Sequence, residues 1–236
     1  MRVSLISALL LTAVAAGQTQ GKAAAPATRT FTDAALHLTF SYPAELTPVD
    51  AKDAIALGQR ILYGEDGVSD TKAIKSGAGC TRTLLAVGEE GRVMAQVALF
   101  EIDLSCVPPK AAKNRKLMDQ VLQGLSSQGN EVLGMTPMDE PSPFLLQGHH
   151  AFFGAAQGTP VSATALQTSE AKVTATIAVE VEGQDGQPKI LAWHVESSDT
   201  GMFNRLLASP VDLGTGPAQP LFPAQVGSGD ASPGVD

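Results

Sequence analysis

Two cysteines, Cys80 and Cys106, are the residues whose chemistry the sequence defines best. The segment between them is typical of a β-hairpin with strands at residues 83–87 and 92–104, which would bring both sulfurs to one end. Since the leader at residues 1–16 is typical of export, the pair should meet oxidising conditions. We predict a structural disulfide worth roughly 3.5 kcal/mol on the chain-entropy model. A redox-exchanging pair is the alternative, but catalytic cysteines usually lie close in sequence, at a helix N-terminus.

The four histidines do not suggest a metal or catalytic cluster. His149 and His150 are neighbours on an expected strand, so their side chains should point to opposite faces and cannot chelate one ion from regular β geometry. His194 lies on the parity opposite to Trp193, which indicates a solvent-facing or second-face role, and His37 is similar. No serine or cysteine nucleophile is placed beside a base, so the sequence predicts no catalytic residue.

Motifs that would fix a reaction or a cofactor are missing from the sequence. There is no Gly-x-Ser-x-Gly elbow, His-Glu-x-x-His helix, phosphate-binding glycine loop or Cys-x-x-Cys pair. The acidic segment 63–70 lacks the spacing of an EF-hand and is interpreted as a solvated loop. Methionine and tryptophan side chains fit core or groove positions: Met118, Met138, Met202 and Trp193. We therefore expect no metal and no cofactor.

Composition limits the class of protein. The 236 residues carry 16 Lys plus Arg against 24 Asp plus Glu, a formal charge of -8, and 44% of them are apolar. These values are typical of one soluble globular domain and exclude global disorder. Basic residues cluster only at residues 110–116, so nucleic acid is not an expected partner.

The N-terminus has the pattern of a bacterial-type secretory signal peptide. Arg2 precedes an apolar run at residues 3–16, and Val14 and Ala16 occupy the spacing of a small-residue cleavage site. The run is too short to cross a bilayer, and no later segment is longer. We expect cleavage near Ala16, a periplasmic or secreted location, and no membrane span in the mature chain.

Hydrophobic periodicity predicts the positions of the main elements. An alternating strand is expected up to Pro43, followed by a helix that starts with Thr47 as N-cap and Pro48 at its first position. An amphipathic helix is expected at residues 114–128, strands at 131–134, 149–155, 173–182 and 191–195, and a last helix from Ser198 or Asp199 to Ala208. A change of parity in the strand at 92–104 indicates a bulge near Leu99.

These elements predict an α+β fold. Strands come in adjacent pairs rather than alternating with helices, which favours an antiparallel sheet with helices packed on it. The predicted organisation is a signal peptide at 1–16, a disordered leader at 17–29, one domain at 30–213 and a Pro/Gly-rich disordered tail at 214–236. Deleting residues 217–236 is therefore expected to leave the core intact.

The segment from Phe31 to Pro43, with an aromatic residue, a short turn and an alternating strand that ends at Tyr-Pro, resembles the opening hairpin of PsbP/Mog1-like domains. The order of the later elements is also similar, over about residues 30–213. The resemblance implies a central antiparallel sheet with helices on both faces, an α/β/α sandwich, and an accessory or binding role rather than catalysis. No functional residue is carried over from that family.

The expected function is that of an exported, non-catalytic binding or accessory domain of the cell envelope. Its partner would be an unidentified protein or envelope component, bound at a sheet edge or in the cleft between sheet and helix. Two alternatives stay open: an extracytoplasmic hydrolase with an unrecognised site, and a weak cation or small-ligand carrier. A pocket with at least three converging polar groups would favour either alternative.

Overall fold

The computed structural model describes residues 27–49, 79–90, 95–108, 110–130, 134–159 and 170–223. The strands are β1 (Thr28–Asp33), β2 (Leu38–Pro43), β3 (Thr47–Pro48), β4 (Thr81–Gly88), β5 (Val97–Ile102), β6 (Met135–Pro137), β7 (Ser142–Leu146), β8 (His149–Gly158), β9 (Lys172–Glu182), β10 (Pro188–Ser197), β11 (Pro210–Asp212) and β12 (Gln219–Pro220). The helices are α3 (Arg115–Gln128) and α4 (Thr200–Leu207), with 3₁₀ turns η1 (Ala34–Leu36), η2 (Leu104–Cys106) and η3 (Ala111–Lys113). The predicted signal peptide, residues 17–26 of the predicted leader and the acidic loop at 63–70 lie outside the described residues. The end of the predicted disordered leader is wrong, because Thr28 and Arg29 belong to β1.

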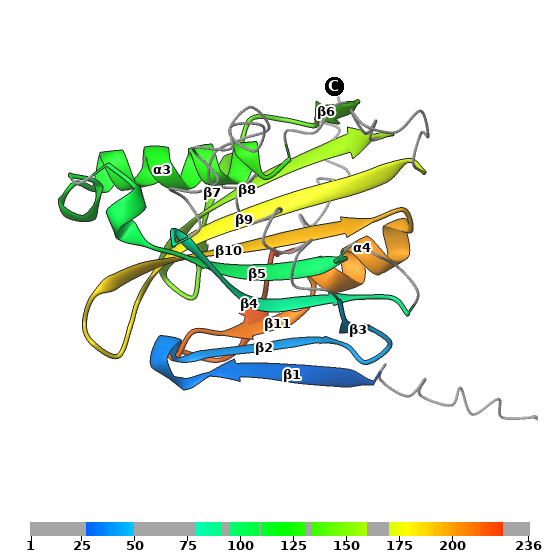
Figure 1. Cartoon of the computed structure of the whole chain (residues 1–236), viewed down its shortest axis with the longest axis horizontal. Coiled ribbons are helices and arrows are strands. Elements are labelled where there is room, and N and C mark those ends of the chain that lie inside the picture. The colour runs from blue at the N-terminus through cyan, green and yellow to red at the C-terminus, as the bar shows by residue number, and fades with distance from the viewer. Residues whose placement is uncertain are drawn as a thin grey trace, which may run out of the picture.

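A large antiparallel sheet forms the centre of the molecule (Figure 1). Its strand order is β3-β4-β5-β10-β9-β8-β6, and β7 also pairs with β8. The long hairpin β9–β10 occupies the middle because both faces of its strands are apolar: Ile177 and Ala178 are each fully buried although they point to opposite sides. The strand predicted at 173–182 and its returning partner are therefore present, with Trp193 opposite Ile177.

One face of this sheet is covered by a second, four-stranded sheet of order β1-β2-β11-β12, together with α4. Phe40 of β2 lies edge-on to Trp193 of β10, with ring centroids 6.2 Å apart. Leu206 of α4 is fully buried in the same core. Asp199 caps α4 by accepting the Met202 N–H at 2.6 Å, so the predicted last helix starts where the sequence placed it.

The other face is covered by α3, which lies along β8 and β9 (Figure 1). Asn114 accepts the Leu117 N–H as N-cap, and Gly129 follows the last turn. Met118, Leu122 and Leu125 form the buried stripe of the helix. The amphipathic helix predicted at 114–128 is thus present, with the predicted apolar face directed at the sheet.

The predicted α/β/α sandwich with helices on both faces is wrong. Most of the described chain is antiparallel sheet, and it contains only two α-helices, of which α4 shares its face with the four-stranded sheet. One reason is visible at Thr47 and Pro48, which form β3 and pair with Val87 and Gly88 instead of starting a helix. The rest of that predicted helix lies outside the described residues.

The tail predicted from residue 214 onward is also wrong for residues 219–222. Gln219 and Pro220 form β12 on the edge of the smaller sheet. Leu221 is fully buried, and Phe222 stacks on Phe153 with ring centroids 3.9 Å apart. A proline-rich sequence pairs here because β12 has only two residues and lies at a sheet edge, where a missing N–H is tolerated.

Cys80 and Cys106 form a disulfide, with their Cα atoms 5.7 Å apart. The cysteines stand at the same end of the β4–β5 pair, because Asp103 N–H donates to the Cys80 carbonyl at 2.8 Å. The register of this pair shifts between Thr83 and Leu85, opposite Phe100 and Leu99. The irregularity predicted near Leu99 is therefore present, but the extra residue lies in β4 and not in β5.

Candidate functional site

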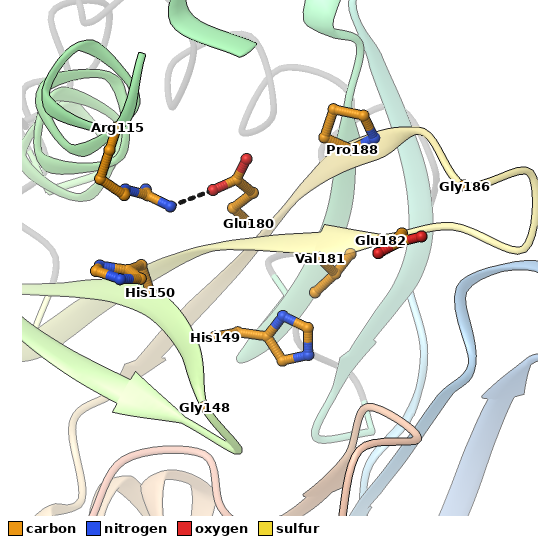
Figure 2. A pocket seen from close by; sticks show the side chains of 9 residues that line it. All are labelled: Arg115, Gly148, His149, His150, Glu180, Val181, Glu182, Gly186 and Pro188. Atoms are coloured by element: carbon orange, nitrogen blue, oxygen red, sulfur yellow. Dashed lines mark hydrogen bonds and ion pairs between the residues drawn. The ribbon is translucent and has the colours of Figure 1, made fainter. Parts of the chain in front are cut away.

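A polar pocket of about 350 Å³ lies between the start of α3, the start of β8 and the β9–β10 turn (Figure 2). Its lining residues are Arg115, Gly148, His149, His150, Glu180, Val181, Glu182, Gly186 and Pro188. It is the place in the described structure where histidine, arginine and glutamate side chains gather around one cavity. It is therefore where the hydrolase and carrier alternatives have to be tested.

Arg115, Glu180 and His150 of this pocket lie in one network of ion pairs with Asp119. Arg115 Nη2 lies 2.7 Å from Asp119 Oδ1, and Arg115 Nη1 lies 2.5 Å from Glu180 Oε2. His150 Nδ1 is 3.7 Å from the same Asp119 oxygen. The Arg115 guanidinium is thus balanced by two carboxylates and offers little positive charge to an anion.

The two neighbouring histidines do not act together. Figure 2 shows His150 on the side of Arg115 and His149 directed toward Val181, as expected for successive residues of a strand. No group of three His, Cys, Asp or Glu side chains suited to a metal ion occurs in the described ranges. The pocket lining contains no Ser, Thr or Cys, so it presents no hydroxyl or thiol nucleophile beside a base.

A second polar pocket, of about 440 Å³, adjoins the disulfide and contains a network of ion pairs. Arg82 Nη2 lies 2.6 Å from Glu101 and 3.5 Å from Asp33, and Lys189 Nζ lies 3.7 Å from Glu101. Burial acts to lower the pKa of Arg82, but the Glu101 and Asp33 carboxylates outweigh it and raise that pKa. These contacts join the ends of β4, β5 and β10, which is a structural role.

The third cavity differs from both because its surface is mainly apolar. It has a volume of about 560 Å³ and lies between strands β8 and β9 and helix α4. Its lining residues are Met138, Asp139, Glu140, Ser142, Phe153, Ala155, Gln157, Val173, Thr200, Phe203, Asn204 and Phe222. We call this cavity the apolar groove; it occupies the type of cleft between sheet and helix that the sequence analysis proposed for binding.

Aromatic side chains from distant parts of the chain build the floor of the apolar groove. Phe153 projects from β8 and is stacked by Phe222, which in turn meets Phe144 of β7 edge-on at a centroid distance of 5.1 Å. Phe203 comes from α4 and is itself 7% exposed. The Phe222 N–H donates to the Leu207 carbonyl at 2.9 Å, so the C-terminal segment is fixed against α4.

The rim of the apolar groove is acidic. Asp139 and Glu140 lie in the segment that joins β6 to β7, and neither carboxylate has an ion-pair partner within the described ranges. Met138 beside them is 50% exposed. Gln157 and Asn204 add neutral polar groups. The groove thus combines an apolar floor with negative charge at one side of its entrance.

The sequence predicted part of this site but not the rest. It assigned Met138 to a core or groove position, and Met138 lies at the rim. It placed Phe222 in a disordered tail, because one aromatic residue among prolines gives no periodic signal. His194 lies on the face opposite to Trp193, as its parity predicts, but it is buried there, with its Nδ1 3.0 Å from Thr176 Oγ1.

Comparisons with known proteins give little guidance. No protein-family model matches the chain, and no curated protein matches it. Among solved structures, the chain is similar to LpqN, described as involved in cell envelope biogenesis of Mycobacterium tuberculosis, with a TM-score of 0.33 and 13% identity over 53% of this chain and 70% of that one. The predicted PsbP/Mog1-like family is not confirmed.

Proposed function

We propose that this chain is an exported, non-catalytic binding protein of the cell envelope that holds its ligand in the apolar groove. The volume and the mainly apolar lining of the groove are the observation that supports this proposal. Binding sites are usually concave and mainly apolar, of roughly 300–1,000 Å³, with a few polar groups that orient the ligand. The apolar groove has these properties, with an aromatic floor and a rim that includes Asn204 and Asp139.

The proposed location outside the cytoplasm rests on two features. The leader at residues 1–16 has the pattern of a signal peptide, with cleavage near Ala16. The Cys80–Cys106 disulfide is a bond that persists in oxidising compartments. No helix in the described part of the chain has the length and apolar character needed to cross a membrane.

The hydrolase alternative has one observation in its favour, the polar pocket around Arg115. Arg115, His150 and Glu180 converge there, which meets the criterion set from the sequence. However, Arg115 is neutralised by its carboxylate partners and the lining supplies no hydroxyl or thiol nucleophile. The same pocket meets the criterion for the carrier alternative, but no group of side chains suited to a cation occurs in the described ranges.

A dye titration tests the proposed function. The mature protein is titrated with Nile red, a neutral apolar dye, and fluorescence is followed to saturation. Ala155→Phe should abolish saturable binding, because Ala155 lines the groove and a phenyl ring there occupies it. Asn204→Trp fills the same space from α4, so the two variants test one groove from opposite walls.

The control variant is Glu182→Gln, which changes the polar pocket and leaves the groove intact. It should bind the dye like the wild type, and all variants should retain the wild-type melting temperature within a few degrees. Dye binding that is absent in the wild type, or that persists in both filled variants, would refute a binding role for the groove.

A further inference from the structure

The sheet edge beside the apolar groove is not paired with another strand of the described structure. Strand β7 pairs with β8, from Ser142 opposite Phe153 to Leu146 opposite His149, and with no other strand in the described structure. Its second edge therefore presents backbone groups that are not part of a ladder. Such an edge is a template for an additional strand unless the fold protects it.

The two exposed large hydrophobic side chains of the described chain lie along this same edge. Met138, directly after β6, is 50% exposed, and Leu145, within β7, is 61% exposed. Single exposed apolar residues are ordinary on a protein surface, but Met138 at the groove and Leu145 on the opposite side of β7 lie on the two flanks of one edge surface. That surface is suited to an apolar, extended partner.

Side chains alternate along β7, so that every second one lies on the same side of the sheet as the groove. Ser142 lines the groove and Phe144 contacts Phe222, so alternate residues of β7 face the groove side of the sheet. Leu145 lies between them in sequence and faces the opposite side. A strand added to β7 would follow the same alternation and direct every second side chain toward the groove.

The negative charge of the rim favours extended partners that carry a positive charge. Asp139 and Glu140 stand where a strand running along β7 would pass toward β6, and neither is neutralised within the described ranges. Elsewhere on the concave surfaces, carboxylates such as Glu101 and Glu180 already have cationic partners. A Lys or Arg side chain on the partner would complete the rim.

We propose that the natural ligand is an extended segment of another polypeptide, with alternating apolar residues and a flanking Lys or Arg, which adds as a strand to β7 and places an apolar side chain in the groove. This proposal rests on the proposed function and names its partner class.

Fluorescence polarisation with synthetic peptides tests the proposal on the mature protein. The probe is a fluorescein-labelled peptide of about eight residues, in which valine and threonine alternate and lysine flanks both ends. A second peptide carries glutamate in place of lysine, and a third is N-methylated at every valine and threonine. We expect saturable binding of the first peptide, at least about fivefold weaker binding of the second, and loss of binding for the third because strand pairing needs its N–H groups.

Protein variants then locate the binding surface. Asp139→Asn combined with Glu140→Gln should weaken the lysine peptide about fivefold and remove its salt dependence. Leu145→Thr, which keeps a strand-forming residue but removes the exposed apolar side chain, should weaken all pairing peptides several-fold. Both changes are at exposed positions, and Glu182→Gln serves again as the control with unchanged affinity.

Distinct outcomes separate this inference from the proposed function. Nile red binding without any peptide binding would overturn the inference and leave the groove as a small-molecule site. Equal affinity for the lysine and glutamate peptides would refute the charge argument. Sedimentation showing a dimer that Leu145→Thr dissociates would assign the edge to a second copy of this chain and would also overturn the proposal. Failure of both dye and peptide would remove both.

Discussion

At the scale of single residues, ion pairing distinguishes charged side chains that act within the fold from those at which a ligand can gain a contact. Lys172 and Glu196 are nearly buried and form an ion pair at 2.8 Å, and Arg115 lies between two carboxylates. Removing one member of the Lys172–Glu196 pair leaves the other uncompensated and should lower stability, whereas the more exposed Arg115 pairs contribute little. Asp139 and Glu140, which lack ion-pair partners in the described ranges, are the carboxylates at which a cationic ligand group gains a new contact.

Asp103 gives a prediction at this scale. Its Oδ1 accepts the Ser105 N–H at 2.7 Å as N-cap of η2, the turn that carries Cys106. This backbone hydrogen bond holds the pKa of Asp103 below its ordinary value of 3.8. Because the folded-state pKa is lowered, the charged cap stabilises the fold above the unfolded-state pKa, and this contribution is lost as pH falls through the folded-state pKa.

Urea unfolding of Asp103→Ala should show a loss of about 1 kcal/mol at neutral pH. The difference from the wild type should shrink between about pH 4 and pH 2, as the wild-type carboxyl becomes protonated. Asp103→Asn keeps an acceptor oxygen and should retain most of the stability at neutral pH. A difference that stays constant over this pH range would show that the carboxylate charge has no part in the cap.

At the scale of elements, periodic amphipathic segments were predictable and short or irregular ones were not. The strand that contains Ile177, the helix that contains Met118 and the cap at Asp199 follow from side-chain spacing, because each buries one regular stripe. Strands β3 and β12 have two residues each, too few to show a period. Thr47 and Pro48 are equally suited to a helix start and to a sheet edge, and only the pairing with β4 decides between them.

The packing of α3 on the sheet gives a prediction at this scale. At Gly154 of β8, an added Cβ would lie 2.5 Å from the Ser126 carbonyl oxygen of α3, whereas at Gly124 of α3 it would meet nothing within 4 Å. Gly154→Ala must push backbone against backbone, and we expect a loss of about 1–3 kcal/mol. Gly124→Ala is the matched control, and it should stabilise the fold by about 0.5–1 kcal/mol because glycine is unfavourable within a helix.

Equilibrium urea unfolding of the two alanine variants measures both effects. Equal stability of Gly154→Ala and the wild type would mean that α3 can move away from β8 at little cost. In that case the Asn130 side chain, whose Nδ2 donates to the Ser126 and Gly154 carbonyls at 2.8 Å each, would not fix the helix to the sheet.

At the scale of the whole molecule, the last described segment of the chain packs against both the smaller sheet and α4. The larger sheet separates the core under α3 from the core under the smaller sheet and α4. In the segment 219–222, Gln219 and Pro220 pair with β11. Leu221 is buried in the core under the smaller sheet and α4, and Phe222 lines the apolar groove. Stability and binding are thus coupled through a segment whose composition resembles a linker.

This coupling predicts the opposite of what the sequence alone indicated for a C-terminal deletion. Leu221 is fully buried, and its N–H donates to the Ser209 carbonyl at 2.9 Å, so Leu221→Ala should cost about 2–5 kcal/mol. Deleting residues 217–236 removes Phe222 as well, and should lower the melting temperature by about 10 °C or more and abolish Nile red binding. Deleting only residues 224–236 keeps every contact described here, so it isolates the contribution of residues 217–223. An unchanged melting temperature for the longer deletion would show that neither Leu221 nor Phe222 stabilises the fold, and that the groove can form without its C-terminal wall.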